Sequence, residues 1–247
     1  MAGGIAKLYV LGLQNGWSLI RIMIRRNMKV EMVKQEGTLT RAPLKTPRAA
    51  AIAGIVFSIL LIASLVLIRI SVPANPQDAG TWLSSGWKTV SLALYLLPFA
   101  GIAFLWFMGV LRDRMGVYED RLFATVFLGS GLLFLAMLFA SAAVAGGMMM
   151  VYRTTPGKLM ESGTYTFGRT VAYQILNVYA MKMAGVFMIS TCTLSIRIGI
   201  FPRWMAFLGY ALALLLLLGT GYFIWAPLVL PLWVLLVSCY ILFANLA

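Results

Sequence analysis

The chain of 247 residues has no histidine, only seven acidic residues and only two cysteines. Without histidine, the commonest general base is missing, and so is the usual ligand of haem, zinc, copper and di-iron centres. Cys192 and Cys239 lie in separate apolar runs, and no disulfide is expected between them. The sequence therefore predicts no metal centre and no cofactor.

Carboxylates are also missing from every segment that could cross a membrane. Proton-coupled transporters usually carry Asp, Glu or His within their spans, so this class is disfavoured. The chain has no P-loop, no dinucleotide fingerprint, no G-x-S-x-G elbow and no CxxC pair. An enzyme is the class that these absences support least. All seven acidic residues fall in predicted loops or termini: Glu31, Glu36, Asp78, Asp113, Glu119, Asp120 and Glu161.

Apolar residues dominate what is present. Hydrophobic residues make up 62% of the chain and charged residues 11%, whereas soluble domains carry about 25% charged residues. Charge-free runs of about 20 residues are long enough to cross a bilayer. The sequence thus predicts an all-α integral membrane protein with one domain, residues 49–247. Its six expected spans are 49–68, 89–111, 122–152, about 178–196, 205–224 and 228–246, with Pro227 and Pro231 marking the last turn.

The first 33 residues predict a different element, an N-terminal amphipathic helix lying in the membrane interface. Basic residues gather on one helical face, and Trp17 and Ile24 lie on the other. A partly inserted or protein-buried helix is the alternative. A linker, residues 34–48, follows. Four basic residues are expected to contact anionic lipid headgroups: Arg21, Arg25, Arg26 and Lys29.

The distribution of basic residues predicts the orientation of the chain. A net charge of +13 is compatible with nucleic-acid binding, but many of the 20 Lys and Arg residues precede the first span. Such clustering is typical of a topology signal, so no nucleic-acid partner is expected. With the N-terminus inside, cytoplasmic segments hold the majority of the basic residues. We therefore expect a multi-pass protein of the inner membrane with both termini in the cytoplasm.

A dense charge cluster follows the second predicted span. Gly109, Leu111, Asp113, Arg114 and Gly116 resemble the G-x-L-x-D-R-x-G-R-R loop motif of the major facilitator superfamily, although Val117 and Tyr118 replace its final basic pair. This similarity, over about ten residues, implies transport. The longer stretch 112–147 resembles a family of uncharacterised bacterial membrane proteins, which implies no activity. Structurally, ion pairs are expected to tie spans two and three together at Arg112, Asp113, Arg114, Glu119, Asp120 and Arg121.

The third predicted span carries small residues on one helical face. Small side chains let two helices approach closely in lipid, so this small-residue stripe is expected to face a neighbouring span or a partner subunit. Phe127, Leu138 and Met149 are expected to point elsewhere. The stripe consists of Gly129, Ala136, Ala140, Ala143 and Gly147.

Span four contains the remaining polar candidates. Lys182 is a lone charge near the start of the span, and it either snorkels to the outer surface or binds an anionic headgroup. Farther along lies a hydroxyl patch, whose members either bond to their own helix or line a transport path. The hydroxyl patch consists of Ser190, Thr191, Thr193 and Ser195.

Together these patterns favour a non-catalytic membrane subunit, an accessory or scaffold component of a larger assembly. The alternative is a small transporter or channel, single or homo-oligomeric, with its path near span four. A lipid-active enzyme or scaffold comes third. The expected partners are membrane lipids and other membrane protein subunits.

Overall fold

The computed structural model describes residues 47–73, 80, 82–115, 121–161, 163–219 and 225–244. All of them belong to one compact unit, Thr46–Ala247. The predicted amphipathic helix, with Arg21, Arg25, Arg26 and Lys29, and the linker up to residue 46 lie outside the described residues. Their predicted contact with lipid headgroups stays a prediction.

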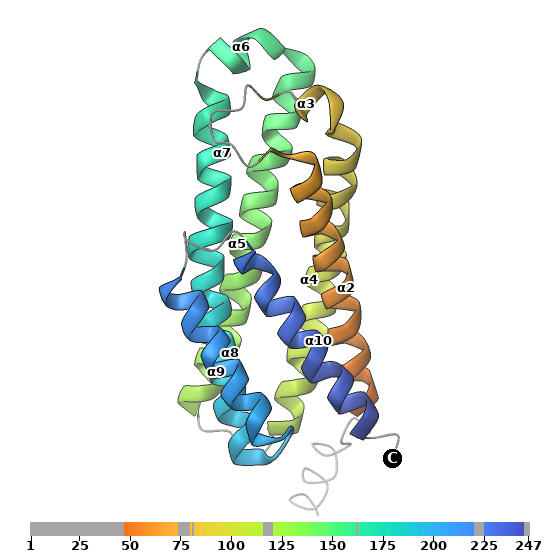
Figure 1. The fold of residues 1–247 in the computed structure, drawn as a ribbon, viewed down its shortest axis with the longest axis vertical. Coiled ribbons are helices and arrows are strands. Elements are labelled where there is room, and N and C mark those ends of the chain that lie inside the picture. The colour runs from red at the N-terminus through yellow and green to blue at the C-terminus, as the bar shows by residue number, and fades with distance from the viewer. Residues whose placement is uncertain are drawn as a thin grey trace, which may run out of the picture. The chain divides into compact units, whose positions relative to one another are not determined.

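The described residues form a bundle of helices that run along one main direction (Figure 1). Short helices α3 and α6 cover one end of the bundle, which we call the α3–α6 end. In chain order the elements are α2 (Pro47–Ser71), α3 (Trp82–Ser85), α4 (Trp87–Met115), α5 (Arg121–Thr154), α6 (Pro156–Glu161), α7 (Thr164–Gln174), the π-helix η2 (Ile175–Ala180), α8 (Met181–Ile198), α9 (Arg203–Leu218) and α10 (Ala226–Ala244).

Five of the described helical segments are long and apolar enough to cross a membrane: 48–71, 87–113, 124–154, 164–198 and 226–244. For the described residues, the prediction of an all-helical bundle with several apolar helices of membrane-spanning length is thereby confirmed. The predicted fifth span coincides with α9, which has only 16 residues. A helix of that length rises about 24 Å, less than the hydrocarbon thickness of about 30 Å. Six complete spans therefore stay a prediction.

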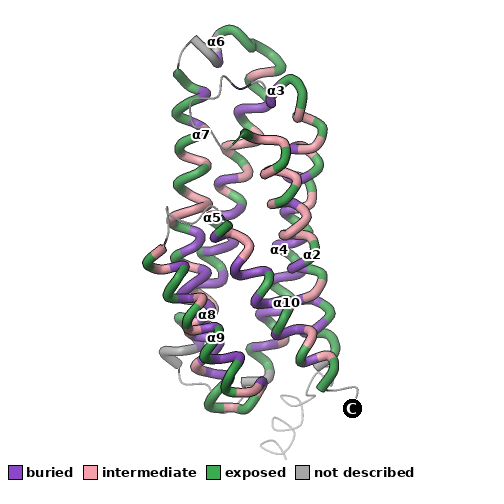
Figure 2. The backbone as a smooth tube through the Cα atoms, viewed as in Figure 1, coloured by how far each residue is buried: buried purple, intermediate pink, exposed green. Residues whose placement is uncertain are grey.

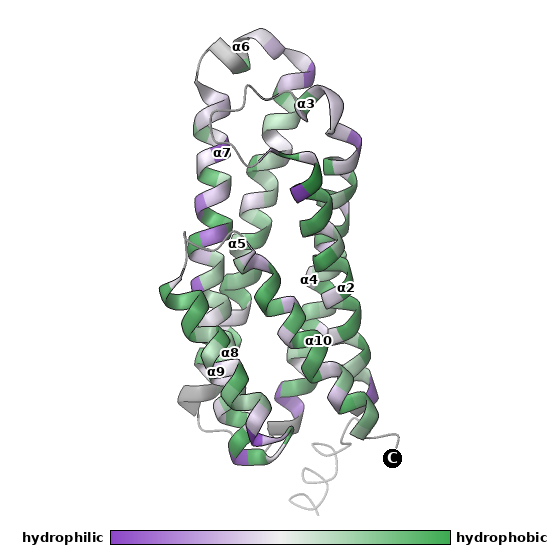
Figure 3. Ribbon diagram, in the orientation of Figure 1, coloured by the Kyte–Doolittle hydropathy of each residue, from purple (hydrophilic) through white to green (hydrophobic). Residues whose placement is uncertain are grey.

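Elements α7, η2 and α8 join into one continuous rod, residues 164–198. Glycines bound the rod because both ends need a left-handed backbone: φ is 68° at Gly163 and 73° at Gly199. Figure 3 shows that α7 is far less hydrophobic than α2, α9 and α10. The predicted fourth span, 178–196, thus matches the apolar part of a longer helix. The polar part of this helix, α7, is not visible in the hydropathy pattern of the sequence.

The last two helices form a hairpin that is shorter than the rod (Figure 1). A Cβ added to Gly185 of α8 would lie 3.1 Å from the Ala213 carbonyl oxygen and 3.1 Å from Leu217 Cγ. The end of α9 is therefore level with the start of α8, while η2 and α7 extend beyond it. Pro231, expected in the turn, lies buried inside α10, and the described turn residue is Trp225.

Aromatic side chains fill the centre of the bundle, where Figure 2 shows the buried positions. Phe104 is fully buried, and its ring centroid lies 4.6 Å from that of Phe57 and 5.1 Å from that of Phe187. Phe127 adds a further contact, 5.0 Å from Phe187. These rings join α2, α4, α5 and α8 into one core. A second cluster, near the α3–α6 end, contains Trp82, Leu83, Val90, Met148, Met149, Leu159 and Tyr165.

The small-residue stripe does not pack against another described helix. Ala136, Ala143 and Gly147 are exposed, whereas Gly129 and Ala140 are half-buried. A Cβ added to either glycine would meet no atom of the described residues within 4 Å. Packing of the stripe on a neighbouring span is therefore contradicted.

The large residues of α5 point inward instead. Phe127 and Leu138 are 0% and 2% exposed, and Met149 is also buried, so the expectation that they point elsewhere was wrong. The physical reason is that the wide spaces between α4, α5 and α8 take aromatic and leucine side chains, which fill volume better than alanine does.

Close helix contacts occur at other glycines. A Cβ on Gly209 of α9 would clash with Cys192 Sγ and would lie 2.8 Å from Trp233 Nε1. A Cβ on Gly54 of α2 would clash with Ser238 of α10. Small residues do permit close approach in this bundle, at positions that the sequence analysis did not select.

We predict that Gly209→Ala lowers the unfolding free energy by about 1 to 3 kcal/mol, because the new methyl group overpacks a contact between three helices. Thermal unfolding in mild detergent measures the effect. Gly129→Ala is the matched control and should be neutral or slightly stabilising, since alanine is the better helix former. Equal effects of the two substitutions would contradict the packing described here.

The orientation prediction can be tested at exposed positions on opposite ends. Thr155 lies at the α3–α6 end, and Arg203 starts α9 at the other end. With cytoplasmic termini, a membrane-impermeant thiol reagent should label Thr155→Cys in intact cells and Arg203→Cys only after permeabilisation. The reverse labelling would show that the basic-residue count gave the wrong orientation.

Candidate functional site

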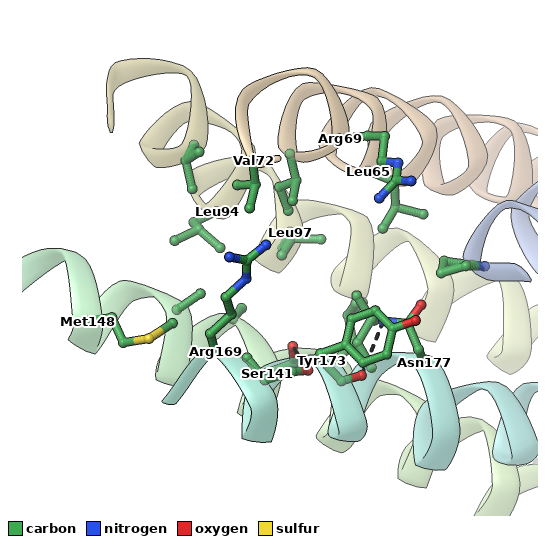
Figure 4. Close-up of a pocket in the computed structure, with 18 of the residues that line it drawn as sticks. Leu65, Arg69, Val72, Leu94, Leu97, Ser141, Met148, Arg169, Tyr173 and Asn177 are labelled. Atoms are coloured by element: carbon green, nitrogen blue, oxygen red, sulfur yellow. Dashed lines mark hydrogen bonds between the residues drawn. The ribbon is translucent and has the colours of Figure 1, made fainter. Parts of the chain in front are cut away.

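A cavity of about 260 Å³ lies between α2, α4, α5 and the α7–η2 part of the rod, just beyond the start of α10 (Figure 4). Leucines from each of these helices make its walls, including Leu65, Leu97, Leu138 and Leu176. The polar side chains that line it are Arg69, Ser141, Arg169, Tyr173 and Asn177, and none of the described lining residues is acidic. The cavity is therefore apolar and positively charged.

Arg169 enters the cavity from α7. Its Nη2 donates a hydrogen bond to the carbonyl oxygen of Pro73, just past the end of α2, and its Nη1 donates to Tyr165 Oη at 3.4 Å. Tyr165 Oη also accepts a hydrogen bond from Trp82 Nε1 at 2.9 Å. This chain of contacts holds the guanidinium in place. Figure 4 shows it reaching across the cavity toward Val72 and Leu94.

Arg69 enters from the last turn of α2, on the opposite side of the cavity. Its guanidinium carbon lies 5.7 Å from the ring centroid of Trp225, a cation–π contact. The C-terminal end of α2 adds a partial negative charge that favours a cation there. Arg69 and Arg169 thus give the described lining of the cavity two positively charged side chains.

The π-helix η2 forms part of the wall, through Leu176 and Asn177. Such π-turns are frequent at functional sites, because the extra residue per turn redirects neighbouring side chains. Asn177 Nδ2 donates to the Tyr173 carbonyl oxygen at 3.1 Å, and Ser141 Oγ donates to the Ala172 carbonyl oxygen at 2.8 Å. The second bond fixes the rod against α5 beside the cavity.

The cavity has a mouth that contains two half-exposed aromatic residues. Tyr173 and Trp225 line the cavity and are each 49% exposed. Tyrosine and tryptophan concentrate at the level of lipid headgroups, where the apolar ring and the polar atom both find partners. The mouth therefore has the side chains of a membrane interface.

Lys182 lies outside this cavity. It is exposed on the first turn of α8, near the level where α9 ends, and it is not a lining residue. Both interpretations of Lys182, snorkelling to the outer surface and binding of an anionic headgroup, stay predictions.

The charge cluster predicted after the second span is described only in part. Arg112 and Asp113 are exposed near the end of α4, far from the α3–α6 end. Glu119 and Asp120 lie outside the described residues, as do the side chains of Arg114 and Arg121. The predicted ion pairs between spans two and three stay a prediction.

All four members of the hydroxyl patch form hydrogen bonds. Thr191 Oγ1 donates to the Phe187 carbonyl oxygen at 2.8 Å, and Ser190 makes the same kind of bond to Val186. Thr193 also bonds to the Tyr210 hydroxyl of α9 at 2.8 Å, and Ser195 Oγ accepts from Phe201 N. These bonds agree with the interpretation that the hydroxyls serve helix packing.

Arg69 and Arg169 are the site residues that sequence reasoning missed. Neither is among the site residues that the sequence predicts. Arg169 has aromatic neighbours in the sequence, Tyr165, Phe167 and Tyr173, but Arg69 has none within ten residues, so no sequence signal joins the two. No protein-family model, curated protein or solved structure matches this chain, so the site rests on its own geometry.

We predict that Tyr165→Phe destabilises the α3–α6 end of the bundle. The substitution leaves the buried Trp82 N–H without its acceptor, at a cost of about 1 to 3 kcal/mol. Thermal unfolding gives the loss of stability. Tyr179→Phe, at an exposed position of η2, is the control and should change little. If the two variants are equally stable, the Trp82–Tyr165 bond does not support the site.

Proposed function

We propose that this protein is a non-catalytic, multi-pass membrane protein whose cavity binds the acidic group of an amphiphilic molecule. One observation carries the proposal: two arginines from separate helices line a single apolar cavity that has no acidic lining residue among those described. Like charges repel each other, and an acidic ligand between two guanidiniums removes that repulsion.

The side chains of the cavity suit such a ligand. Guanidinium groups bind phosphates and carboxylates through paired, charge-assisted hydrogen bonds. The leucine walls take an alkyl chain, at roughly 25 cal/mol for each Å² of apolar surface buried. The described lining residues include no Asp, Glu, His, Cys or Lys, the usual acids, bases and nucleophiles. Binding is therefore better supported than chemistry.

The predicted location extends the proposal. If both termini are cytoplasmic and the protein lies in the inner membrane, the α3–α6 end and the mouth of the cavity lie toward the outer face. The cavity is then open to lipids or other amphiphiles of the outer leaflet.

We expect Arg69→Gln and Arg169→Gln each to weaken binding of dodecyl phosphate by about tenfold to a hundredfold, because a hydrogen bond to a charged group contributes about 1.5 to 3 kcal/mol. The shift of the melting temperature with dodecyl phosphate concentration, in non-ionic detergent, measures binding. Arg153→Gln is the control: Arg153 is a basic residue at the same end that stacks on Trp87 and does not line the cavity. Equal weakening by all three substitutions would mean that surface charge alone attracts the ligand.

A role as a subunit of a larger assembly is the second candidate, and the exposed small-residue stripe of α5 favours it. Three of its five members are exposed although the sequence pattern suits close helix packing. A helix from a partner or from a second copy would find a shallow, smooth face there.

We predict that Ala143→Leu leaves the stability of the isolated chain unchanged but reduces its association with a partner or a second copy. Light scattering during size-exclusion chromatography measures the association. Ala211→Leu, on an exposed position of α9, controls for added surface hydrophobicity, and Ala100→Leu, at a fully buried position, should destabilise the chain itself. Unchanged association for Ala143→Leu would indicate that the stripe faces lipid.

A further inference from the structure

We infer that the occupant of the cavity is a bilayer phospholipid whose headgroup carries a second acidic group beyond its phosphodiester, and that it enters sideways from the leaflet at the α3–α6 end. This inference rests on the proposed function and adds the source of the ligand, its orientation and the role of each arginine. Arg69 binds the phosphodiester, and Arg169 binds the distal acidic group.

The depth of Arg69 supports the first contact. Arg48 and Arg69 lie near opposite ends of α2, with an uncharged stretch between them. That stretch rises about 30 Å, the thickness of the hydrocarbon layer. Arg69 therefore lies at the boundary where lipid phosphates are found. Its stacking on the half-exposed Trp225 keeps the guanidinium at the mouth.

Arg169 lies farther from the hydrocarbon. Its guanidinium binds the backbone of Pro73, which follows Arg69 by about one helical turn, or roughly 5 Å along the axis. The Arg69 side chain instead reaches Trp225 at the start of α10. Figure 4 shows the two guanidiniums at separate places along the cavity. Two cations at different depths fit a headgroup with two anionic groups in line.

The size of the cavity fits a headgroup and excludes a whole lipid. Its volume of about 260 Å³ lies just under the range of roughly 300 to 1,000 Å³ for sites that enclose a drug-sized ligand. A phospholipid with two acyl chains is larger than such a ligand. Most of its two chains must therefore stay outside, in the bilayer, while the headgroup and the first methylene groups of a chain occupy the cavity, the latter against the leucine walls.

The packing of the helices provides the side opening. α2 packs against α4 and α10, whereas α7 packs against α5, η2 and α6. The hairpin ends on the side of the cavity away from the α3–α6 end, where Pro227 and Leu228 form the floor of the cavity. The half-exposed Tyr173 and Trp225 border the mouth between α2 and the rod. A lipid can thus keep its chains beside α2 and the hairpin while its headgroup turns inward.

Native mass spectrometry of protein extracted from nanodiscs tests the inference. The nanodiscs contain phosphatidylcholine with a small fraction of either phosphatidylglycerol, which has one phosphate, or phosphatidylinositol 4-phosphate, which has two. We expect the natural chain to retain phosphatidylinositol 4-phosphate about tenfold better than phosphatidylglycerol, and phosphatidylglycerol better than phosphatidylcholine. Arg169→Gln should make the two anionic lipids equal, and Arg69→Gln should lower the retention of both toward that of phosphatidylcholine.

A soluble competitor separates the two sources of the anion. Inositol 1,4-bisphosphate carries the same phosphates without chains and should not displace the retained lipid at comparable concentration. Efficient displacement, or equal retention of both anionic lipids by the natural chain, overturns this inference. The proposed function would still stand if dodecyl phosphate binding depends on Arg69 and Arg169. Loss of that dependence would overturn both.

Discussion

The cavity exists because the α9–α10 hairpin is shorter than the helices it packs against. The end of α9 reaches only the start of α8, where Leu217 lies against Gly185. The rod continues beyond this level through η2 and α7, and the described hairpin residues border the space between the rod and α2 only through Trp225, Pro227 and Leu228. The aromatic core holds α2, α4, α5 and α8 together below, and the Trp82–Tyr165 bond with its apolar cluster closes the α3–α6 end above. The space between these two packed regions is the candidate site.

Among the described residues, the neighbours that hold the two arginines are neutral. A ring face holds Arg69, and a backbone carbonyl and a tyrosine hydroxyl hold Arg169. Neutral partners of this kind fix the position of a guanidinium without adding a negative charge, so this arrangement of described residues favours an anionic ligand. The same cations would be very costly at the centre of a bilayer. The proposed position near the interface would explain why the fold tolerates them.

Sequence reasoning located most of the apolar helices but not the site. Charge-free runs bounded by arginine predicted α2, α4 and α5 to within a few residues, because desolvation of a charge sets the limits of a span. The same reasoning missed α7, whose polar residues are helical through packing on α5. It also placed Phe127, Leu138 and Met149 away from the core, where they in fact lie, since helical periodicity cannot show which face of α5 packs within the bundle. Arg69 and Arg169 are separated by about a hundred residues, and only the tertiary fold brings them to one cavity.

The central claim is that the hairpin end and the mouth of the cavity lie at the level of the lipid headgroups. Spin-label depth measurements test it most directly, with a nitroxide at Lys182→Cys, near the level of the hairpin end, and another at Leu232→Cys, an exposed position within α10. The account predicts that the label at position 182 lies in the interfacial region, while the label at position 232 lies within the hydrocarbon. A label at position 182 as deep in the hydrocarbon as the one at position 232 would contradict it.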